Sequence, residues 1–148
     1  MATEAGCTFC DVVSGQIRSV IVFEDQDCLG FLDHRPLFPG HTLLVPKRHI
    51  ETLIDLPDKL VSSLFSSAKL LTAAVQDACR AGGSFVAINN KVSQSVPHLH
   101  VHIVPRRKGD GLKGFFWPRF PYKSEEDKQA IAQAIREEVA RLEVSQKK

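Results

Sequence analysis

The stretch that most constrains this chain runs from Pro97 to Pro105 and reads Pro-His-Leu-His-Val-His-Ile-Val-Pro. Within it, His98, His100 and His102 occupy every second position, and apolar residues fill the gaps. A period of two predicts a β-strand with three imidazoles on one face and apolar side chains on the other. Same-face neighbours on a strand stand about 6.6 to 6.8 Å apart. Adjacent rings can then share one phosphoryl-sized substrate, or one ring can bind a metal beside another.

A single histidine is most often a surface residue or a hydrogen-bonded core residue. In this chain, half of the six histidines fall within five consecutive positions. Burying several titratable rings on one strand face costs desolvation energy, and clusters of titratable groups are typical of functional sites. We therefore interpret the alternating histidines as a site.

Composition narrows the class of protein. The chain has 148 residues, 43% hydrophobic and 24% charged, which is ordinary for one soluble globular domain. A net charge of +2 is too small to favour a long nucleic acid, so a small phosphorylated ligand fits better. The first residues show neither the basic segment nor the apolar run of a signal peptide, and no run of eighteen apolar residues occurs. We expect a cytoplasmic protein that does not bind membranes.

The four cysteines divide into two kinds. Cys7 and Cys10 form a C-x-x-C pair, which in a reducing compartment indicates metal or redox chemistry before a structural disulfide. Cys28 and Cys79 lie in apolar stretches and are predicted to be small core residues.

Hydrophobic periodicity predicts an α+β domain with an antiparallel sheet and its helices on one side. The predicted strands span residues 20–24, 28–33, 41–45, 84–90 and 98–104. A helical turn is expected over 11–16 and a long helix over about 57–80, and Ser124 is expected to cap a second helix. Pro36, Pro39 and Gly40 mark the loop before the third strand.

The strand supports a phosphoryl-transfer chemistry. A neutral imidazole attacks phosphorus readily, and the phosphoramidate that forms is labile to water. We take the central ring, His100, as the nucleophile, with a carbonyl fixing its tautomer, and His102 as a donor to a phosphate oxygen or the leaving atom. Asn90, Gln94 and Ser95, on the loop that enters the strand, are candidate donors to the non-bridging oxygens.

The run Gln-Ser-Val-Pro-His-Leu-His-Val-His-Ile at 94–103 closely resembles the signature of the histidine triad (HIT) superfamily. The Cys7–Cys10 pair, Phe-Leu-Asp at 31–33 and Pro-Lys-Arg-His-Ile at 46–50 look like Hint-type and bacterial-type members in the same order. The loop between Asn90 and Gln94 looks shorter than in Hint-type members, and the aromatic tail is similar to that of bacterial-type relatives. The resemblance implies a single HIT domain over 1–148, with five antiparallel strands, one long helix and a C-terminal helix. It also implies that the segment from about 112 to 148 packs on the domain.

The resemblance also implies site residues. Asp33 would bind ribose hydroxyls, with Phe31 and His34 near the base. Gln94 and Ser95 match positions that contact the phosphate and leaving group, and His98, His100 and His102 form the catalytic triad of histidines.

A metal site is implied as well. Cys7, Cys10, His49 and His98 supply two thiolates and two imidazoles, the ligand count and softness of a closed tetrahedral zinc site. Some members of the resembled family carry zinc on this pattern, so we expect a structural Zn²⁺ that ties the N-terminus to the triad strand. The alternative is a reduced pair without metal. A thioredoxin-like role lacks the βαβ context that it needs.

The leading functional hypothesis is a hydrolase or transferase that cleaves AMP-like or GMP-like purine nucleotides at the α-phosphate through a nucleotidyl-histidine. Phosphoramidates, diadenosine polyphosphates and mixed-anhydride adenylates are candidate substrates. The alternatives are a nucleotide-binding interaction module and a phosphorylase or nucleotidyltransferase of the same superfamily. The near-neutral charge disfavours DNA-end processing, which needs several phosphate-neutralising residues.

The segment from Phe115 to Tyr122 holds five aromatic residues and two prolines, and it must bury its rings. The resemblance implies a homodimer, and Trp117 and Arg119 are the expected contacts toward the nucleotide site of the partner.

Overall fold

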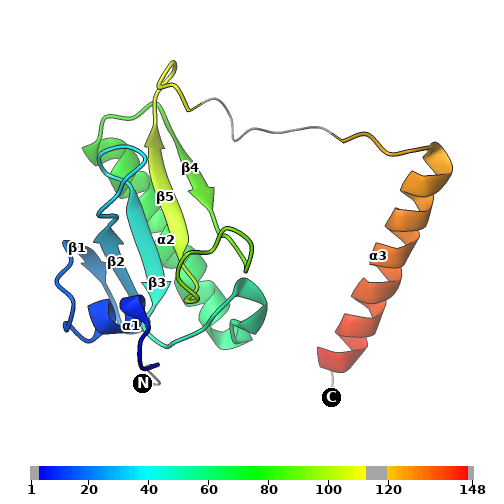
Figure 1. Cartoon of the computed structure of the whole chain (residues 1–148), viewed down its shortest axis with the longest axis horizontal. Helices are drawn as coiled ribbons and strands as arrows, with labels where there is room; N and C mark the ends of the chain where they lie inside the picture. Colours follow the sequence, from blue (N-terminus) through cyan, green and yellow to red (C-terminus); the bar gives the residue numbers. More distant parts are fainter. Residues whose placement is uncertain (1–3, 113–119, 147–148) are drawn as a thin grey trace. The chain divides into compact units, whose positions relative to one another are not determined.

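The computed structural model describes residues 4–112 and 120–146. The chain forms two compact units, Met1–Asp110 and Gly111–Lys148. Among the described residues, the first unit holds all five strands and two of the three α-helices (Figure 1). Every residue that the sequence predicts for the catalytic, substrate and metal sites belongs to this first unit.

The strands of the first unit form one antiparallel sheet. They are β1 (Ile21–Glu24), β2 (Cys28–Leu32), β3 (Thr42–Pro46), β4 (Gly83–Ala87) and β5 (Val101–Arg106). Their order is β1-β2-β3-β5-β4, and every neighbouring pair is antiparallel. The predicted five-stranded antiparallel sheet is confirmed. The strand that continues the histidine run, β5, has a partner on each side.

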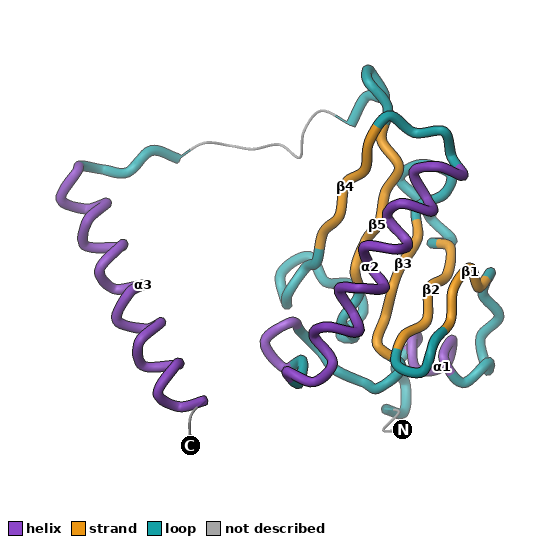
Figure 2. The backbone as a smooth tube through the Cα atoms, turned by 180° about the vertical axis from the view of Figure 1, so that it is seen from behind, coloured by secondary structure: helices purple, strands orange, loops and turns teal. Residues whose placement is uncertain are grey.

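Helix α2 (Asp58–Ala78) lies across one face of the sheet (Figure 2). Pro57 immediately precedes the helix, where a missing N–H is harmless. The buried side chains of Leu64, Leu71 and Val75 pack in one hydrophobic cluster with strand residues. The long helix predicted over about 57–80 is confirmed.

The apolar members of the histidine run face α2. Leu99, Val101 and Ile103 belong to the α2 cluster and are at most 1% exposed. His102 pairs with Leu43 across the β3–β5 ladder, and Leu43 belongs to a second cluster on the opposite face. The period of two therefore sorts the side chains onto the two faces as predicted.

Helix α1 (Thr8–Val13) covers the opposite face of the sheet. Its Phe9 and Val12 pack in the second cluster with Phe31 and other β2 and β3 residues. The expectation that all helices lie on one side is therefore wrong. The helix also begins earlier than the turn expected at 11–16, because Cys7 Sγ accepts a hydrogen bond from Cys10 N at 3.5 Å and caps the first turn.

Two strands differ by three residues at one end from their predicted bounds, whereas the other three differ by at most one residue at either end. β5 begins at Val101 rather than at 98, because Leu99 N donates to Ile50 O at 2.6 Å, outside the strand ladder. β4 ends at Ala87 rather than at 90, and Asn90 Oδ1 instead accepts from Leu53 N at 2.8 Å, at the start of the short 3-10 helix η1 (Leu53–Asp55).

The loop between β2 and β3 turns at Gly40, as the Pro-Gly pattern predicts. Gly40 has a φ of +97°, a conformation that L side chains rarely adopt. A Cβ at this position would also overlap Cys79 Sγ at the end of α2. The turn therefore depends on glycine for two reasons, and it places His41 at the start of β3.

The second unit contains helix α3 (Glu125–Gln146). Ser124 Oγ accepts a hydrogen bond from Asp127 N at 3.1 Å, so the predicted cap is confirmed. Residues 115–119, which include the expected dimer contacts Trp117 and Arg119, lie outside the described residues. The packing of the C-terminal segment on the first unit stays a prediction. In the part of the chain that the structure describes, no helix has the length and apolarity needed to cross a membrane.

Candidate active site and metal centre

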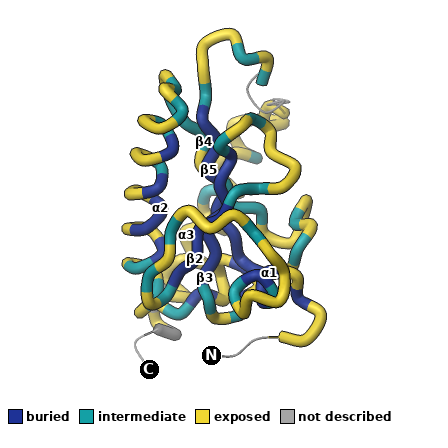
Figure 3. The backbone as a smooth tube through the Cα atoms, turned by 90° about the vertical axis from the view of Figure 1, so that its left-hand side faces the viewer, coloured by how far each residue is buried: buried dark blue, intermediate teal, exposed yellow. Residues whose placement is uncertain are grey.

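A cavity of about 720 Å³ opens between α1 and the face of the sheet that carries the histidines. Figure 3 shows the buried strands β3 and β5 beside α1. The described residues that line it are Thr8, Phe9, Val12, Ile17, Arg18, Ser19, Phe31, Leu32, Asp33, His34, Arg35, Leu43, Ser95, Val96, His100 and His102. The lining therefore combines His100 and His102 with apolar side chains such as Phe9 and Phe31.

His100 is held in a single tautomer. Its side chain is buried, and its Nδ1 lies 2.7 Å from His98 O. A carbonyl oxygen only accepts hydrogen bonds, so Nδ1 carries the proton and donates. Burial lowers the pKa of His100, although the hydrogen bond with His98 O opposes this shift. At neutral pH, Nε2 therefore keeps its lone pair, the state that a nucleophile needs.

His102 is held in the complementary tautomer by a chain of hydrogen bonds. Leu37 N donates to His41 Nδ1 at 3.1 Å, so His41 carries its proton on Nε2. His41 Nε2 lies 3.0 Å from His102 Nδ1 and donates to it. Burial, with His100 and His41 nearby, lowers the pKa of His102 to about 4. The neutral ring of His102 therefore carries its proton on Nε2 and can donate it to a ligand.

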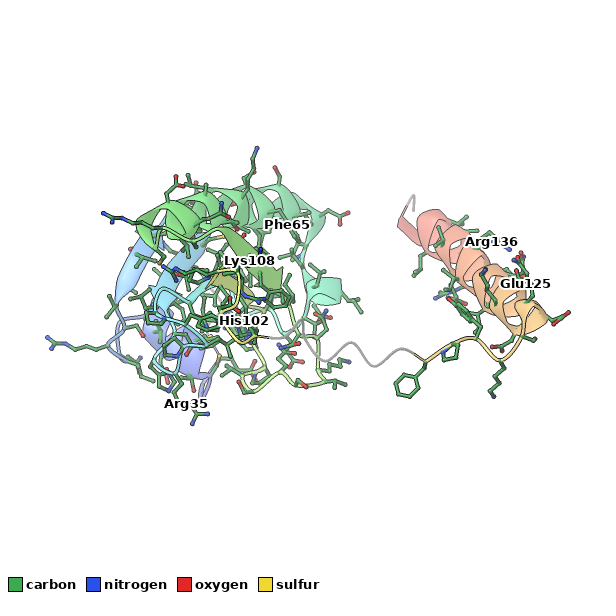
Figure 4. All side chains as sticks on the ribbon, turned by 90° about the horizontal axis from the view of Figure 1, so that it is seen from above. Arg35, Phe65, His102, Lys108, Glu125 and Arg136 are labelled. Atoms are coloured by element: carbon green, nitrogen blue, oxygen red, sulfur yellow. The ribbon has the colours of Figure 1, made fainter. Side chains whose placement is uncertain are left out.

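Asp33 lies at the rim of the cavity, at the end of β2. Its Oδ1 accepts a hydrogen bond from Arg35 N at 2.9 Å, and its Oδ2 lies 3.6 Å from His41 Nδ1. The second distance is too long for a hydrogen bond, so Asp33 Oδ2 remains available to a ligand. Figure 4 shows Arg35 at the surface of this rim and His102 inside the unit.

The structure brings most of the predicted substrate residues to one cavity. Phe31, Asp33, His34 and Ser95 line it together with His100 and His102, and the His34 side chain is 90% exposed at the edge. His98 is not among the described lining residues, because both of its ring nitrogens face the metal cluster and the backbone.

Asn90 and Gln94 are also not among the described residues that line the cavity. Gln94 Nε2 donates to Glu51 O and its Oε1 accepts from Lys91 N, both at 2.7 Å. The Asn90 carboxamide oxygen is bound to Leu53 N, as described above. Both carboxamides therefore hydrogen-bond to the backbone of the 51–53 segment, and the phosphate contacts expected of them stay predictions.

The four predicted metal ligands lie close together at the N-terminal end of the histidine run, on the face of the sheet that α1 covers. The side chains of Cys7, Cys10, His49 and His98 place their ligand atoms within 4.8 Å of one another. Cys7 Sγ lies 3.4 Å and Cys10 Sγ 3.6 Å from His98 Nδ1, and Cys10 Sγ lies 3.4 Å from His49 Nδ1. These residues come from α1, the segment after β3 and the segment before β5.

The geometry of this cluster fits zinc. Tetrahedral bonds of about 2.3 Å to sulfur and about 2.0 Å to nitrogen place sulfur and nitrogen ligands roughly 3.5 Å apart, as the cluster has them. His98 Nε2 donates to Pro46 O at 2.8 Å, which leaves the Nδ1 lone pair directed at the thiols. His49 Nε2 lies 2.8 Å from Glu4 Oε2. A carbonyl partner such as that of His98 orients a metal-bound histidine, whereas the contact of His49 Nε2 with Glu4 lacks the geometry of a hydrogen bond.

A second group, Asp33, His41 and His102, also lies close together. Three of its four ring nitrogens are already occupied, because His41 Nδ1 accepts from Leu37 N and His41 Nε2 donates to His102 Nδ1, while His102 Nε2 carries a proton. We interpret this group as a hydrogen-bond network and not as a metal site.

Sequence reasoning assigned no role to His41 or to the α1 residues that wall the cavity. His41 is 3% exposed, and the signal for it was the Pro-Gly-His sequence that enters β3. Phe9 and Val12 carried no comparable signal, because apolar residues beside a C-x-x-C pair fit any small core.

Comparisons with curated proteins place the chain among known relatives. It is 39% identical to the protein hit of Bacillus subtilis over 90% of this chain and 94% of that protein. It is 30% identical to the adenosine 5'-monophosphoramidase HNT1 of Candida albicans, over 80% of this chain and 82% of that protein. It is 34% identical to the adenylylsulfatase HINT3 of Arabidopsis thaliana, over 72% of this chain and 55% of that protein.

Solved structures agree with these relatives. A HIT-family protein from Bacillus subtilis superposes with a TM-score of 0.82 at 34% identity, covering 89% of this chain and 96% of that one. A zinc-bound histidine triad protein from Mycobacterium smegmatis superposes with a TM-score of 0.69 at 36% identity, covering 88% and 96%. The family model described as the HIT domain matches residues 14–109. The chain therefore belongs to the HIT domain family, the histidine triad superfamily that its 94–103 motif resembles.

Proposed function

We propose that this protein cleaves purine nucleotides at the α-phosphate and passes through a nucleotidyl-His100 intermediate. The observation that carries the proposal is the pair of opposite tautomers in one cavity. His100 presents a lone pair on Nε2, and His102 presents a proton on Nε2. A nucleophile and a hydrogen-bond donor side by side suit attack on a phosphoryl group.

The chemistry divides into two displacements. In the first, His100 Nε2 forms a bond to the α-phosphorus while the bond from phosphorus to the leaving group breaks. The leaving group departs with the bonding electron pair and takes up a proton. In the second, a water oxygen attacks the same phosphorus, the P–N bond breaks with its electron pair returning to His100 Nε2, and a nucleoside monophosphate is released. The proton that the water loses replaces the one that the leaving group took up. His102 donates its Nε2 proton to a phosphoryl oxygen or to the leaving atom.

The rest of the cavity suits a nucleoside. Asp33, at the rim, has a carboxylate oxygen available for ribose hydroxyls. The Phe31 ring and the neighbouring apolar wall offer a surface for a purine, and His34 lies at the edge. Ser95 lines the same cavity as His100 and His102 and is a predicted donor to the phosphate. The contacts expected between the phosphate and the carboxamides of Asn90 and Gln94 stay predictions.

We propose in addition that Cys7, Cys10, His49 and His98 hold one Zn²⁺. When bound, the ion would supply a structural cross-link between α1, His49 and the segment that leads into β5. The sulfur–nitrogen distances and the second hydrogen bond of His98 support this assignment. The homodimer implied by the family stays a prediction.

The function is tested with a panel of adenylylated compounds. The full-length protein is incubated with adenosine 5'-phosphoramidate, adenylyl sulfate and diadenosine tetraphosphate, and AMP release is followed by chromatography. The names of the phosphoramidase and adenylylsulfatase relatives motivate the first two compounds. Turnover of at least one compound with AMP as product supports the proposal. No AMP from any of them, with AMP itself still bound, indicates a nucleotide-binding module instead.

A second arm repeats the panel with inorganic phosphate. A hydrolase gives AMP at an unchanged rate, whereas a phosphorylase diverts the product to ADP. Guanosine analogues of the best substrate then define the base preference.

A further inference from the structure

Helix α1 borders both the metal cluster and the nucleotide cavity. Cys7, its N-cap, and Cys10 are two of the four cluster ligands. Thr8, Phe9 and Val12 of the same helix line the cavity. One helix of only six residues therefore carries half of one site and a wall of the other.

Phe9 lies between the two cysteines and contacts residues of both sites. Its ring centroid is 5.1 Å from that of His100 and 6.0 Å from that of His98, in edge-to-face arrangements. It is also 5.4 Å from the ring of Phe31 in the cavity wall. Aromatic pairs at these separations are attractive and orient one another. The His100 ring thus contacts Phe9, a residue that lies between two of the proposed metal ligands, Cys7 and Cys10, in the sequence.

The position of α1 depends on side chains. Helices of six residues are unstable by themselves. Among the described residues, the backbone hydrogen bonds of 7–17 are local. The bond between Ile17 N and Asp11 O, six positions apart, spans the most residues. What fixes α1 against the sheet is therefore the cluster of Cys7 and Cys10 with the two histidines, together with the packing of Phe9 and Val12.

We propose that zinc binding at the cluster and nucleotide binding in the cavity are thermodynamically coupled through α1, with Phe9 as a positioning residue for His100. The proposal rests on the proposed function and concerns the regulation of that same site. Zinc fixes α1, α1 fixes the cavity wall and the ring of His100, and the nucleotide binds to the ordered wall. Metal supply would then set how much of the protein binds its substrate.

Linkage makes the coupling reciprocal. If zinc raises the affinity for a nucleotide by some factor, the nucleotide must raise the affinity for zinc by the same factor. Coupling between two sites of one domain is typically about 5- to 150-fold. We expect the dissociation constant of AMP to rise at least about fivefold when zinc is removed.

The test uses the full chain and AMP, the product of the proposed reaction, which is not turned over. AMP affinity is measured by calorimetry on zinc-loaded protein and on protein stripped with a chelator. Zinc affinity is measured by competition with a chromophoric chelator, with and without saturating AMP. Equal factors of about fivefold or more in both directions support the coupling. Factors below twofold in both directions overturn it, while AMP binding to the zinc-loaded protein and turnover by it leave the proposed function intact.

Variants separate α1 from general folding effects. Phe9→Leu keeps an apolar side chain but removes the ring against His100. The Phe9→Leu protein should still bind one zinc ion per chain. It should bind AMP more weakly than the parent and show a smaller coupling factor. Asp11→Asn changes the same helix at a residue that lines a separate hollow with Glu4 and Ser14. It serves as the matched control and should keep the coupling factor of the parent protein.

The Phe9 comparison also decides the case in which the metal-free chain unfolds. The zinc-loaded Phe9→Leu protein must then bind AMP more weakly than the zinc-loaded Asp11→Asn protein. Equal AMP affinity of the two variants overturns the role of Phe9 and with it the proposal. Failure of the proposed function is a different result, in which the zinc-loaded parent binds no AMP and forms no AMP from any substrate.

Discussion

His41 Nε2 and His102 Nδ1 face each other at 3.0 Å, and the direction of the hydrogen bond between them is set from outside the cavity. The backbone N–H of Leu37, in the loop before β3, donates to the far nitrogen of His41. A main-chain group in this loop thereby decides which nitrogen of His102 carries a proton. The pair makes His41 a positioning residue.

Replacement of His41 tests this role. His41→Leu removes the donor to His102 and should lower kcat about tenfold or more, because a ring in the wrong tautomer cannot donate to the phosphoryl group. His41→Gln can place an amide N–H near the same point and should recover part of the rate. KM should change little in both variants. Equal kcat values for the two variants and the parent would rule out the role.

The proposed nucleophile gives the largest expected effect. His100→Asn should lower kcat at least about 10³-fold while AMP still binds, because the lost interaction exists only along the reaction path. Parent protein denatured at alkaline pH during turnover should carry a nucleotidyl mass on His100 that acid then removes, and the variant should not. As the control, His34→Asn alters a histidine at the cavity edge that has no part in the chemical step, so it should keep the kcat of the parent, whatever its effect on KM. A His100→Asn protein that turns over at the parent rate contradicts the mechanism.

Acid stability should report the burial of His102. Its pKa is lowered in the folded chain from 6.5 to about 4. Between these values the unfolded chain binds a proton that the folded chain does not, so the free energy of unfolding falls as pH falls. The contribution is complete above pH 6.5 and is lost progressively as pH falls toward 4.

Chemical denaturation at several pH values measures this contribution. His102→Gln should show a shallower loss of stability between pH 6.5 and 4 than the parent. The slope of the free energy of unfolding against pH should differ between the two proteins by less than the slope that one proton gives. The ring is only partly buried, and solvent screens it. A steeper slope for His102→Gln would reverse the sign of the argument.

The metal prediction is one zinc per chain. Cys7→Ser should lower both the zinc content and the melting temperature, the latter by roughly 10 °C, because the binding energy of such a site is largely folding energy. Cys79→Ser, which changes a cysteine outside the cluster, should keep the zinc. Metal analysis and calorimetry check both variants. A parent protein free of metal, with a melting temperature that strong chelators leave unchanged, contradicts the site.

Gly40 offers a double-mutant cycle with Cys79. Gly40→Ala should cost roughly 1–3 kcal/mol of stability, because the position has a positive φ and the new Cβ meets Cys79 Sγ. Cys79→Ala removes that sulfur and should recover the steric part of the loss but not the backbone part. Urea unfolding of the two single variants and the double variant measures the interaction. Strict additivity would show that the contact does not limit this turn.

The sheet, the long helix and the division of the histidine run between two faces could be predicted because each depends on a local period. His100 and His102 occupy the cavity for that reason. The metal cluster joins Cys7 to His98 over 91 positions, and no local pattern reports such a contact. It was predicted from ligand chemistry and family resemblance.

The differences have local physical causes that sequence periodicity does not carry. The carboxamides of Asn90 and Gln94, expected near the phosphate, hydrogen-bond to the nearby 51–53 backbone, a contact that sequence periodicity does not report. Helix α1 lies on the unexpected face because Cys7 caps it and its apolar side chains pack against β2 and β3. His41 gained its importance from a single backbone donor, which only the three-dimensional loop provides.

His102 has a ladder partner on each side, Leu43 on β3 and Ala87 on β4. Amide protons in the middle of a sheet exchange slowly with solvent, because they are released only when large parts of the protein open. His102 should therefore be among the last residues to open, whereas α1 and the loop from Asp33 to His41 belong to the rim. Nucleotides can then enter and leave by local opening of the rim, while the strand that carries His102 remains folded through every turnover.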